Sequence, residues 1–234
     1  MKNLVIFGVF VLILILLQFA QGQTVDDIID KYIAALGGHE NLASLQTVIM
    51  EGKITTQLSD LGITNTISHL TGLRLEVEIN GIINNQVANT TKGTVFWPSN
   101  GMTSPEEMEP GQFLSIVNQM DIQGVLFNYK GKGIHVELIG KEEINDSMAY
   151  HLKVRFKNGT TSHFYVDIKT SLLVKITEKP VLNNPKAEIT TYYSNYKQNV
   201  DGYWFAYTVT TANGTIYYEK ITTNLPVEES LFDN

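Results

Sequence analysis

Hydrophobic and polar positions along the chain change their period several times, and each change predicts a different element. Residues 5–19 form an apolar run behind a single lysine, and Ala20 and Gly22 are the small residues at the −3 and −1 positions of a signal-peptidase cleavage site. The run is short for a membrane span, so we expect a cleaved export signal over residues 1–22, with an uncleaved anchor as the alternative. The mature protein would begin at Gln23 and form one domain over residues 23–234.

Residues 24–36 carry apolar side chains at helical spacing and have both a start and a stop signal. Thr24 and Asp27 have the spacing of a capping box, in which each side chain accepts a hydrogen bond from a free backbone N–H group. Gly37–Gly38 would end this helix, and a second short helical turn is expected over His39–Leu45. So short a helix is not stable alone, so its apolar stripe must pack on another surface. The stripe is Val25, Ile28, Ile29, Tyr32, Ile33 and Leu36.

From Gln46 onward the apolar period becomes two, which is typical of half-buried strands. The clearest case alternates Leu73, Leu75, Val77 and Ile79 with Arg74, Glu76 and Glu78. Asn80–Gly81 then predicts a type I′ hairpin turn. The same alternation recurs over residues 134–141, 148–156, 161–167, 172–178, 187–197, 203–210 and 215–223. Because the links are mostly short, we expect an antiparallel meander of roughly ten or eleven strands, wide enough to curl toward a barrel.

One long segment interrupts this alternation. Residues 103–107 are interpreted as a helix start, with Pro105 near the first helical position and Pro110–Gly111 disturbing the helix. Residues 113–120 then form a second amphipathic stripe. Both apolar stripes need a surface to cover, and the concave face of the sheet is the large one available. The sequence therefore predicts a mainly β fold, a curved antiparallel sheet forming an incomplete barrel with helices over its concave face.

Composition argues against nucleic-acid binding and against any role that needs cysteine. The net charge is −7 and the basic residues do not cluster, so nucleic acid is not an expected partner. The chain has no cysteine, so neither a disulfide nor acylation of a lipobox cysteine is possible. An exported domain without disulfides must be held together by its hydrophobic core.

The sequence gives little indication of a catalytic or metal-binding site. The sequence has no nucleophile elbow, no phosphate-binding loop and no histidine pair at helical metal spacing. His151 and His163 fall on adjacent expected strands and could lie near each other. Glu106, Glu107 and Glu109 are interpreted as a solvated helix start that favours negative charge. We therefore expect no catalytic residue, no metal ligand and no cofactor, and a protein that is not an enzyme.

Several motifs together resemble a known family. The helix over residues 24–38, Leu42–Leu45 and a strand ending at Met50–Gly52 resemble the opening of the LolA/LppX-like superfamily of bacterial outer-membrane lipoprotein-sorting proteins, in particular an uncharacterised Bacteroidetes-type branch. Further matches are Asn128–Gly133, Val136–Glu142, Tyr150–Val154, Thr191–Tyr196 and Pro226–Phe232. The resemblance implies an incomplete antiparallel barrel, closed by helices over a hydrophobic cavity. The cavity arginine of the best-known carriers has no match, because Arg74 and Arg155 are expected on the polar faces of their strands.

The resemblance implies an exported, periplasmic or secreted protein that binds a lipid or a lipoprotein acyl chain, with an envelope membrane protein as a possible partner. Aromatic and aliphatic residues would line the cavity, and residues 97–133 would act as lid and entrance. The expected lining is Leu75, Val77, Phe96, Trp97, Phe113, Leu114, Val117 and Phe127. In the alternative interpretation these side chains fill the core, and the protein is a structural or interaction module of the envelope.

Overall fold

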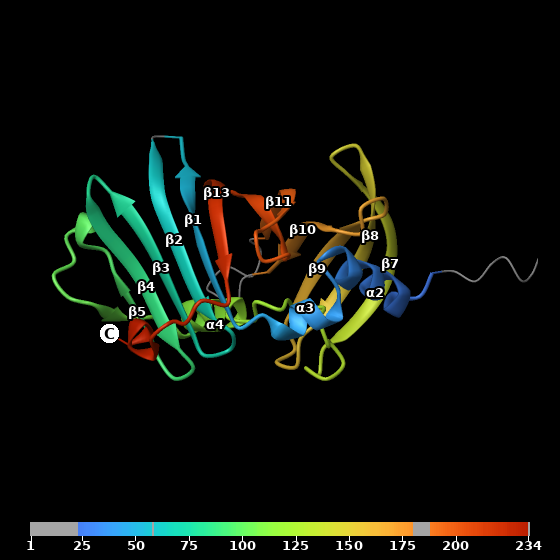
Figure 1. The fold of residues 1–234 in the computed structure, drawn as a ribbon, viewed down its shortest axis with the longest axis horizontal. Helices are drawn as coiled ribbons and strands as arrows, with labels where there is room; N and C mark the ends of the chain where they lie inside the picture. The colour runs from blue at the N-terminus through green and yellow to red at the C-terminus, as the bar shows by residue number, and fades with distance from the viewer. Residues whose placement is uncertain (1–22, 58, 180–187, 234) are drawn as a thin grey trace, which may run out of the picture.

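The computed structural model describes residues 23–57, 59–179 and 188–233 (Figure 1). The expected export signal over residues 1–22 lies outside the described residues, as does Ala187 at the start of one expected strand. Within the described part of the chain, no helix is long and apolar enough to cross a membrane.

The described strands form one open antiparallel sheet, so the predicted mainly β fold is confirmed. Its 13 strands lie in the order β6-β5-β4-β3-β2-β1-β13-β12-β11-β10-β9-β8-β7. The strands are β1 (Thr47–Thr55), β2 (Asp60–Ser68), β3 (Gly72–Ile79), β4 (Ile82–Asn89), β5 (Gly93–Phe96), β6 (Glu106–Glu107), β7 (His135–Ile144), β8 (Ser147–Arg155), β9 (Thr161–Asp167), β10 (Leu173–Glu178), β11 (Ile189–Gln198), β12 (Trp204–Thr211) and β13 (Gly214–Thr223). Two of them, β2 and β6, are additions to the segments that the alternation selects. In β2 the polar Asn65 interrupts the apolar positions, and β6 consists of two glutamates.

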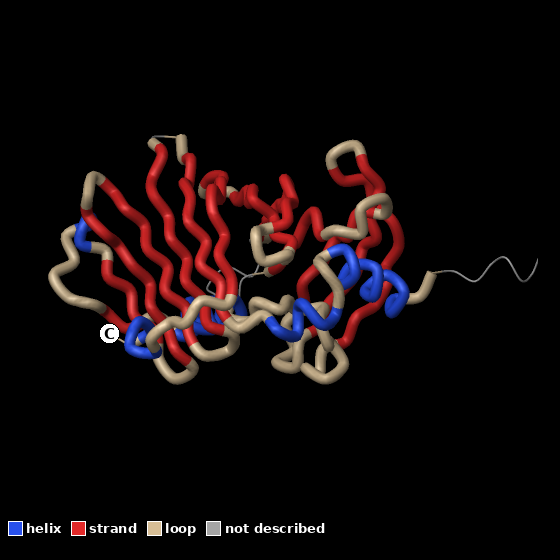
Figure 2. Tube along the Cα trace, in the orientation of Figure 1, coloured by secondary structure: helices blue, strands red, loops and turns tan. Residues whose placement is uncertain are grey.

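The described helices are fewer than the strands. They are α2 (Val25–Ala35), α3 (His39–Ser44) and α4 (Pro110–Gln119), with 3₁₀ turns η1 (Pro98–Asn100) and η2 (Glu229–Phe232). The capping box of α2 is confirmed, because Asp27 donates its backbone N–H to the Thr24 hydroxyl and Thr24 donates its own to the Asp27 carboxylate. Figure 2 shows the helical segments as short pieces against a long run of strands.

The expected start of the second amphipathic helix is wrong. Glu106 and Glu107 are extended and pair with Val95 and Thr94 of β5, respectively. The helix begins instead at Pro110, the residue interpreted as disturbing it. Proline at the first helical position loses no intrahelical hydrogen bond, and its fixed φ angle suits the helix, so Pro110 favours this start.

The sheet is open between β6 and β7, and one chain segment crosses that opening. Residues 108–134 leave β6 at one edge, form α4, and return to β7 at the other edge. Lys132 and Asp121, both largely buried, form a salt bridge of 2.6 Å that links two parts of this crossing segment. The Lys132 ammonium also donates to the Gly124 carbonyl.

Two separate apolar cores lie on the same face of the sheet, which we call the inner face. One core joins α2 to strands β7–β10 and includes Ile28 and Leu152. The other joins α4 to strands β1–β4, β12 and β13 and includes Val48 and Ile116. Figure 1 shows α2 and α3 beside β7–β9, and α4 near one end of β1–β4. The helices therefore cover the two flanks of the sheet.

The outer face of β3 is covered by the C-terminal segment. Phe232 of η2 is buried, and a Cβ atom added at Gly72 would lie 2.2 Å from the Cγ atom of Phe232. Asn89 of β4 also donates to the carboxylate of Asp233. The absence of a side chain at Gly72 is what lets the ring approach the strand.

Candidate functional site

A row of apolar side chains crosses five neighbouring strands on the inner face. Cross-strand register pairs Tyr193 with Val209, Val209 with Ile216, Ile216 with Ile54, and Ile54 with Leu61. Directly paired residues share one face of a sheet, so these five form a continuous surface, the inner row. All five are half-buried, whereas the core residues beneath the helices are buried. The inner row therefore keeps part of its apolar surface open.

Tyrosine hydroxyls in and near this row lie in a poorly solvated environment. Burial raises the pKa of Tyr193 to about 12, and the nearby Glu178 and Tyr218 add to the shift. Burial also raises the pKa of Tyr218 to about 12. Burial among protein atoms also raises the pKa of the Glu178 carboxyl, although much of the surface of Glu178 remains accessible to solvent. Side chains that are open to solvent and yet surrounded by protein atoms are typical of a concave wall.

The sequence-predicted lining residues divide among several environments. Leu75, Phe113 and Val117 meet at the core beneath α4. Phe127 is buried in the other core, where its ring centroid lies 4.7 Å from that of His39. Leu114 is half-buried on α4. The structure therefore brings three of the predicted residues together and places Phe127 across the sheet from them.

Val77 lies under the loop that follows β5. It pairs with Asn84, which is fully buried. The Oδ1 atom of Asn84 accepts hydrogen bonds from the backbone N–H and the hydroxyl of Ser99, at 3.1 and 2.6 Å. The η1 turn is thereby held over this part of β4, and Val77 is buried.

Phe96 is the last residue of β5, so its strand register decides which face it lies on. Phe96 pairs with Asn85, and Asn85 with Glu76. Glu76 alternates with Leu75, which packs on the core beneath α4 on the inner face, so Glu76 and Phe96 lie on the outer face. Trp97 is half-buried at the end of β5, and its backbone N–H contacts the Met102 sulfur at 3.2 Å.

Arg74 lies on the outer face, as its place in the alternation predicts. Its guanidinium donates from Nε and Nη2 to one carboxylate oxygen of Glu76, at 3.0 and 2.9 Å. Arg155, the other arginine considered, is half exposed and lies 3.9 Å from Glu137. Neither arginine belongs to the inner row.

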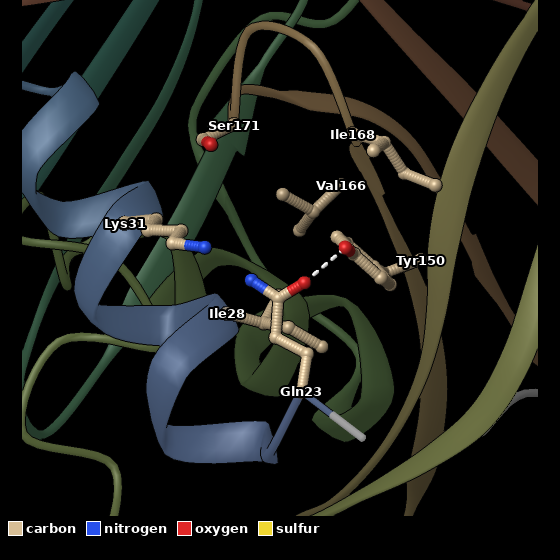
Figure 3. Close-up of a pocket in the computed structure, with 7 residues that line it drawn as sticks. All are labelled: Gln23, Ile28, Lys31, Tyr150, Val166, Ile168 and Ser171. Atoms are coloured by element: carbon tan, nitrogen blue, oxygen red, sulfur yellow. Dashed lines mark hydrogen bonds between the residues drawn. The ribbon is translucent and has the colours of Figure 1, made fainter. Parts of the chain in front are cut away.

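A pocket of about 200 Å³ lies elsewhere, between the start of α2 and the ends of β8 and β9 (Figure 3). Its apolar lining is Ile28, Val166 and Ile168, and its polar lining is Gln23, Lys31, Tyr150 and Ser171. The Tyr150 hydroxyl donates to the Gln23 side-chain oxygen. None of these residues was among the expected lining, because the pocket forms only when α2 packs on the distant strands β8 and β9.

Titratable side chains gather at one further place, on the outer face of β7–β9. His151 Nε2 lies 2.7 Å from His163 Nδ1, which confirms the expected proximity of this pair. His151 Nδ1 lies 3.4 Å from Glu142, and the His151 ring stacks on Tyr165. Among the described residues, no group of three or more His, Asp or Glu side chains is arranged to hold a metal ion.

Comparison with known proteins shows the fold. No protein-family model matches this chain, and no curated protein matches it. Among solved structures, a LolA superfamily protein from Nitrosomonas europaea aligns with a TM-score of 0.57 and 14% identity, over 91% of this chain and 99% of that one. The chain has the LolA-like fold.

Two further structures share the LolA-like fold with this chain. One is a domain from Vibrio parahaemolyticus named for outer-membrane lipoprotein sorting, with a TM-score of 0.54, 14% identity, and coverage of 88% of this chain and 95% of that one. The other is a DUF1329 family protein from Desulfovibrio piger, with a TM-score of 0.56, 12% identity, and coverage of 91% and 98%. At these identities the likeness concerns the fold.

Proposed function

We propose that this protein is an exported, non-enzymatic carrier that binds a lipid or another acyl-chain-like ligand along the inner row. The observation that carries the proposal is the row itself, five half-buried apolar side chains on adjacent strands. Five strands spaced about 4.8 Å apart span roughly 19 Å, which suits an extended acyl chain better than a compact metabolite. Burial of about 0.8 kcal/mol per methylene group would drive binding without a catalytic group.

The proposal assigns the deeper wall of the site to residues near α4. Leu75, Phe113 and Val117 each pack against the same buried core there. We propose that residues 97–133 act as the lid, so that movement of α4 away from β3 and β4 would extend the apolar surface inward. Val77, Trp97, Leu114 and Phe127 belong to the same proposed lid and wall, and Phe96 is excluded because it lies on the outer face.

Two features support an envelope location and an apolar cargo. The apolar run at residues 5–19 has the pattern of an export signal. One protein of the same fold is named for outer-membrane lipoprotein sorting, and lipoproteins carry acyl chains.

A binding titration tests this proposal. The full chain is expressed in a bacterium, purified, and titrated with a fluorescent long-chain fatty acid. Ile216→Asp places a charge in the inner row and should weaken binding at least about tenfold. Ile83→Asp is the matched control, because Ile83 pairs with Glu78 on the outer face and is exposed. Equal affinities of the two variants, or no binding by the unmodified protein, would contradict the proposal.

The second candidate function is an interaction module with a filled core. The specific observation in its favour is the outer edge of β7, which ends the sheet and exposes Leu138 and Ile139. An unpaired strand edge can add a strand from a partner protein. Absence of fatty-acid binding in the titration would favour this candidate.

A further inference from the structure

We propose that the pocket beside α2 is a second binding site, for a small amphiphile that carries a single negative charge on a carboxylate. None of its lining residues belongs to the inner row, so the site is distinct from that of the proposed acyl-chain ligand.

The floor of the pocket is apolar and the rim is rich in hydrogen-bond donors. Ile28 and Val166 are almost fully buried in the core that joins α2 to the sheet. Around them lie the Lys31 ammonium, the Ser171 hydroxyl and the side-chain amide of Gln23 (Figure 3), while the Tyr150 hydroxyl already donates to Gln23. Donors beside an apolar floor suit a ligand with an acceptor head and a hydrocarbon tail.

The Lys31 ammonium is the positive charge that lines the pocket. It has no carboxylate within 4 Å among the described residues, although the charge of Asp27, one helical turn earlier, interacts with it. Asp26 accepts from Tyr129 and Lys130, and Asp27 accepts from the Thr24 backbone. The Lys141 ammonium, 5.5 Å from the centre of the Tyr150 ring, adds positive charge near the pocket. One unpaired ammonium at the rim matches one negative charge on a ligand.

The volume selects a small ligand. A pocket of about 200 Å³ holds the equivalent of roughly seven water molecules at about 30 Å³ each. A carboxylate with a short aliphatic tail fits this space, whereas the phosphate and glycerol of a lipid headgroup with its two chains do not. The proposed ligand class is therefore a free short- or medium-chain carboxylate.

The test is calorimetric titration of the purified full-length protein with octanoate. Octanoate should bind, and octan-1-ol and octylammonium should bind at least about tenfold more weakly. Lys31→Gln should lower octanoate affinity by about tenfold and Lys31→Arg should largely retain it. Lys53→Gln, at an exposed lysine that pairs with Glu219 on another part of the sheet, is the matched control and should bind as the unmodified protein does.

Two further experiments locate the site and decide whether the charged group of the ligand is a carboxylate or a phosphate. Amide chemical-shift changes on octanoate addition should centre on Ile28, Lys31 and Ser171, and they should persist in Ile216→Asp, which separates this site from the inner row. Dihexanoyl phosphatidic acid should bind more weakly than octanoate. Equal octanoate affinity in Lys31→Gln, equal affinity for octan-1-ol, tighter binding of the phosphate lipid, or no octanoate binding would each overturn the proposal.

Discussion

Substitution of Gly72 by alanine should expel Phe232 from the outer face of the sheet. The added Cβ atom would lie 2.2 Å from the Cγ atom of Phe232, so the ring must leave or the strand must shift. Removing a buried phenylalanine costs about 3–5 kcal/mol, and we take the lower end because η2 lies near the chain terminus and can move. We therefore expect Gly72→Ala and Phe232→Ala each to lower the free energy of unfolding by about 3 kcal/mol.

The double variant tests whether the two effects share one cause. Without the Phe232 ring the Cβ atom at position 72 has no clash, and alanine in a strand is about 0.5–1 kcal/mol better than glycine. Gly72→Ala should therefore be neutral or stabilising in the Phe232→Ala background. Denaturant unfolding followed by the fluorescence of the two tryptophans measures all four proteins. If the two costs add, Phe232 does not pack on Gly72 and the assignment of the outer face is wrong.

Two smaller predictions concern local stability. Thr24→Ala removes one acceptor of the capping box and should lower the free energy of unfolding by about 1 kcal/mol, whereas Thr24→Ser should retain it; denaturant unfolding separates the two. Burial alone would raise the pKa of Asp167, but hydrogen bonds from Ser147 and Thr170 lower it below its usual value. The stability from ionised Asp167 is thus present above the unfolded-state pKa of about 3.9 and is lost as the pH falls through the lower folded-state pKa. Melting temperatures between pH 5 and pH 2 should therefore fall less steeply for Asp167→Asn, and identical slopes would contradict this.

Features set by neighbouring residues could be predicted from the sequence. The capping box needs only Thr24 and Asp27, three positions apart, and both of its hydrogen bonds are present. Asn80 and Gly81 both have positive φ angles, as the expected type I′ turn requires. Such signals act over a few residues, so distant packing does not alter them.

Features set by strand register could not be predicted with the same success. The sequence suggested Phe96 and Trp97 together as lining, but only the pairing of β5 with β4 shows that Phe96 faces outward. The helix start was misplaced because Glu106 and Glu107 pair with β5, a contact that the helical pattern does not contain.

The inner row likewise depends on contacts between distant segments. Its members Ile54 and Ile216 meet because the first strand pairs with the last one. No local pattern in the sequence marks this pairing. Because β1 pairs with β13, the two free edges of the sheet are β6 and β7.

The most direct test of the central claim is native mass spectrometry with lipid extraction, applied to protein purified from a bacterial envelope. The account predicts co-purified species that carry acyl chains, at lower occupancy in Ile216→Asp than in Ile83→Asp. A mass that shows no bound species, an extract free of lipid, and no adduct after addition of a long-chain fatty acid would together contradict the account.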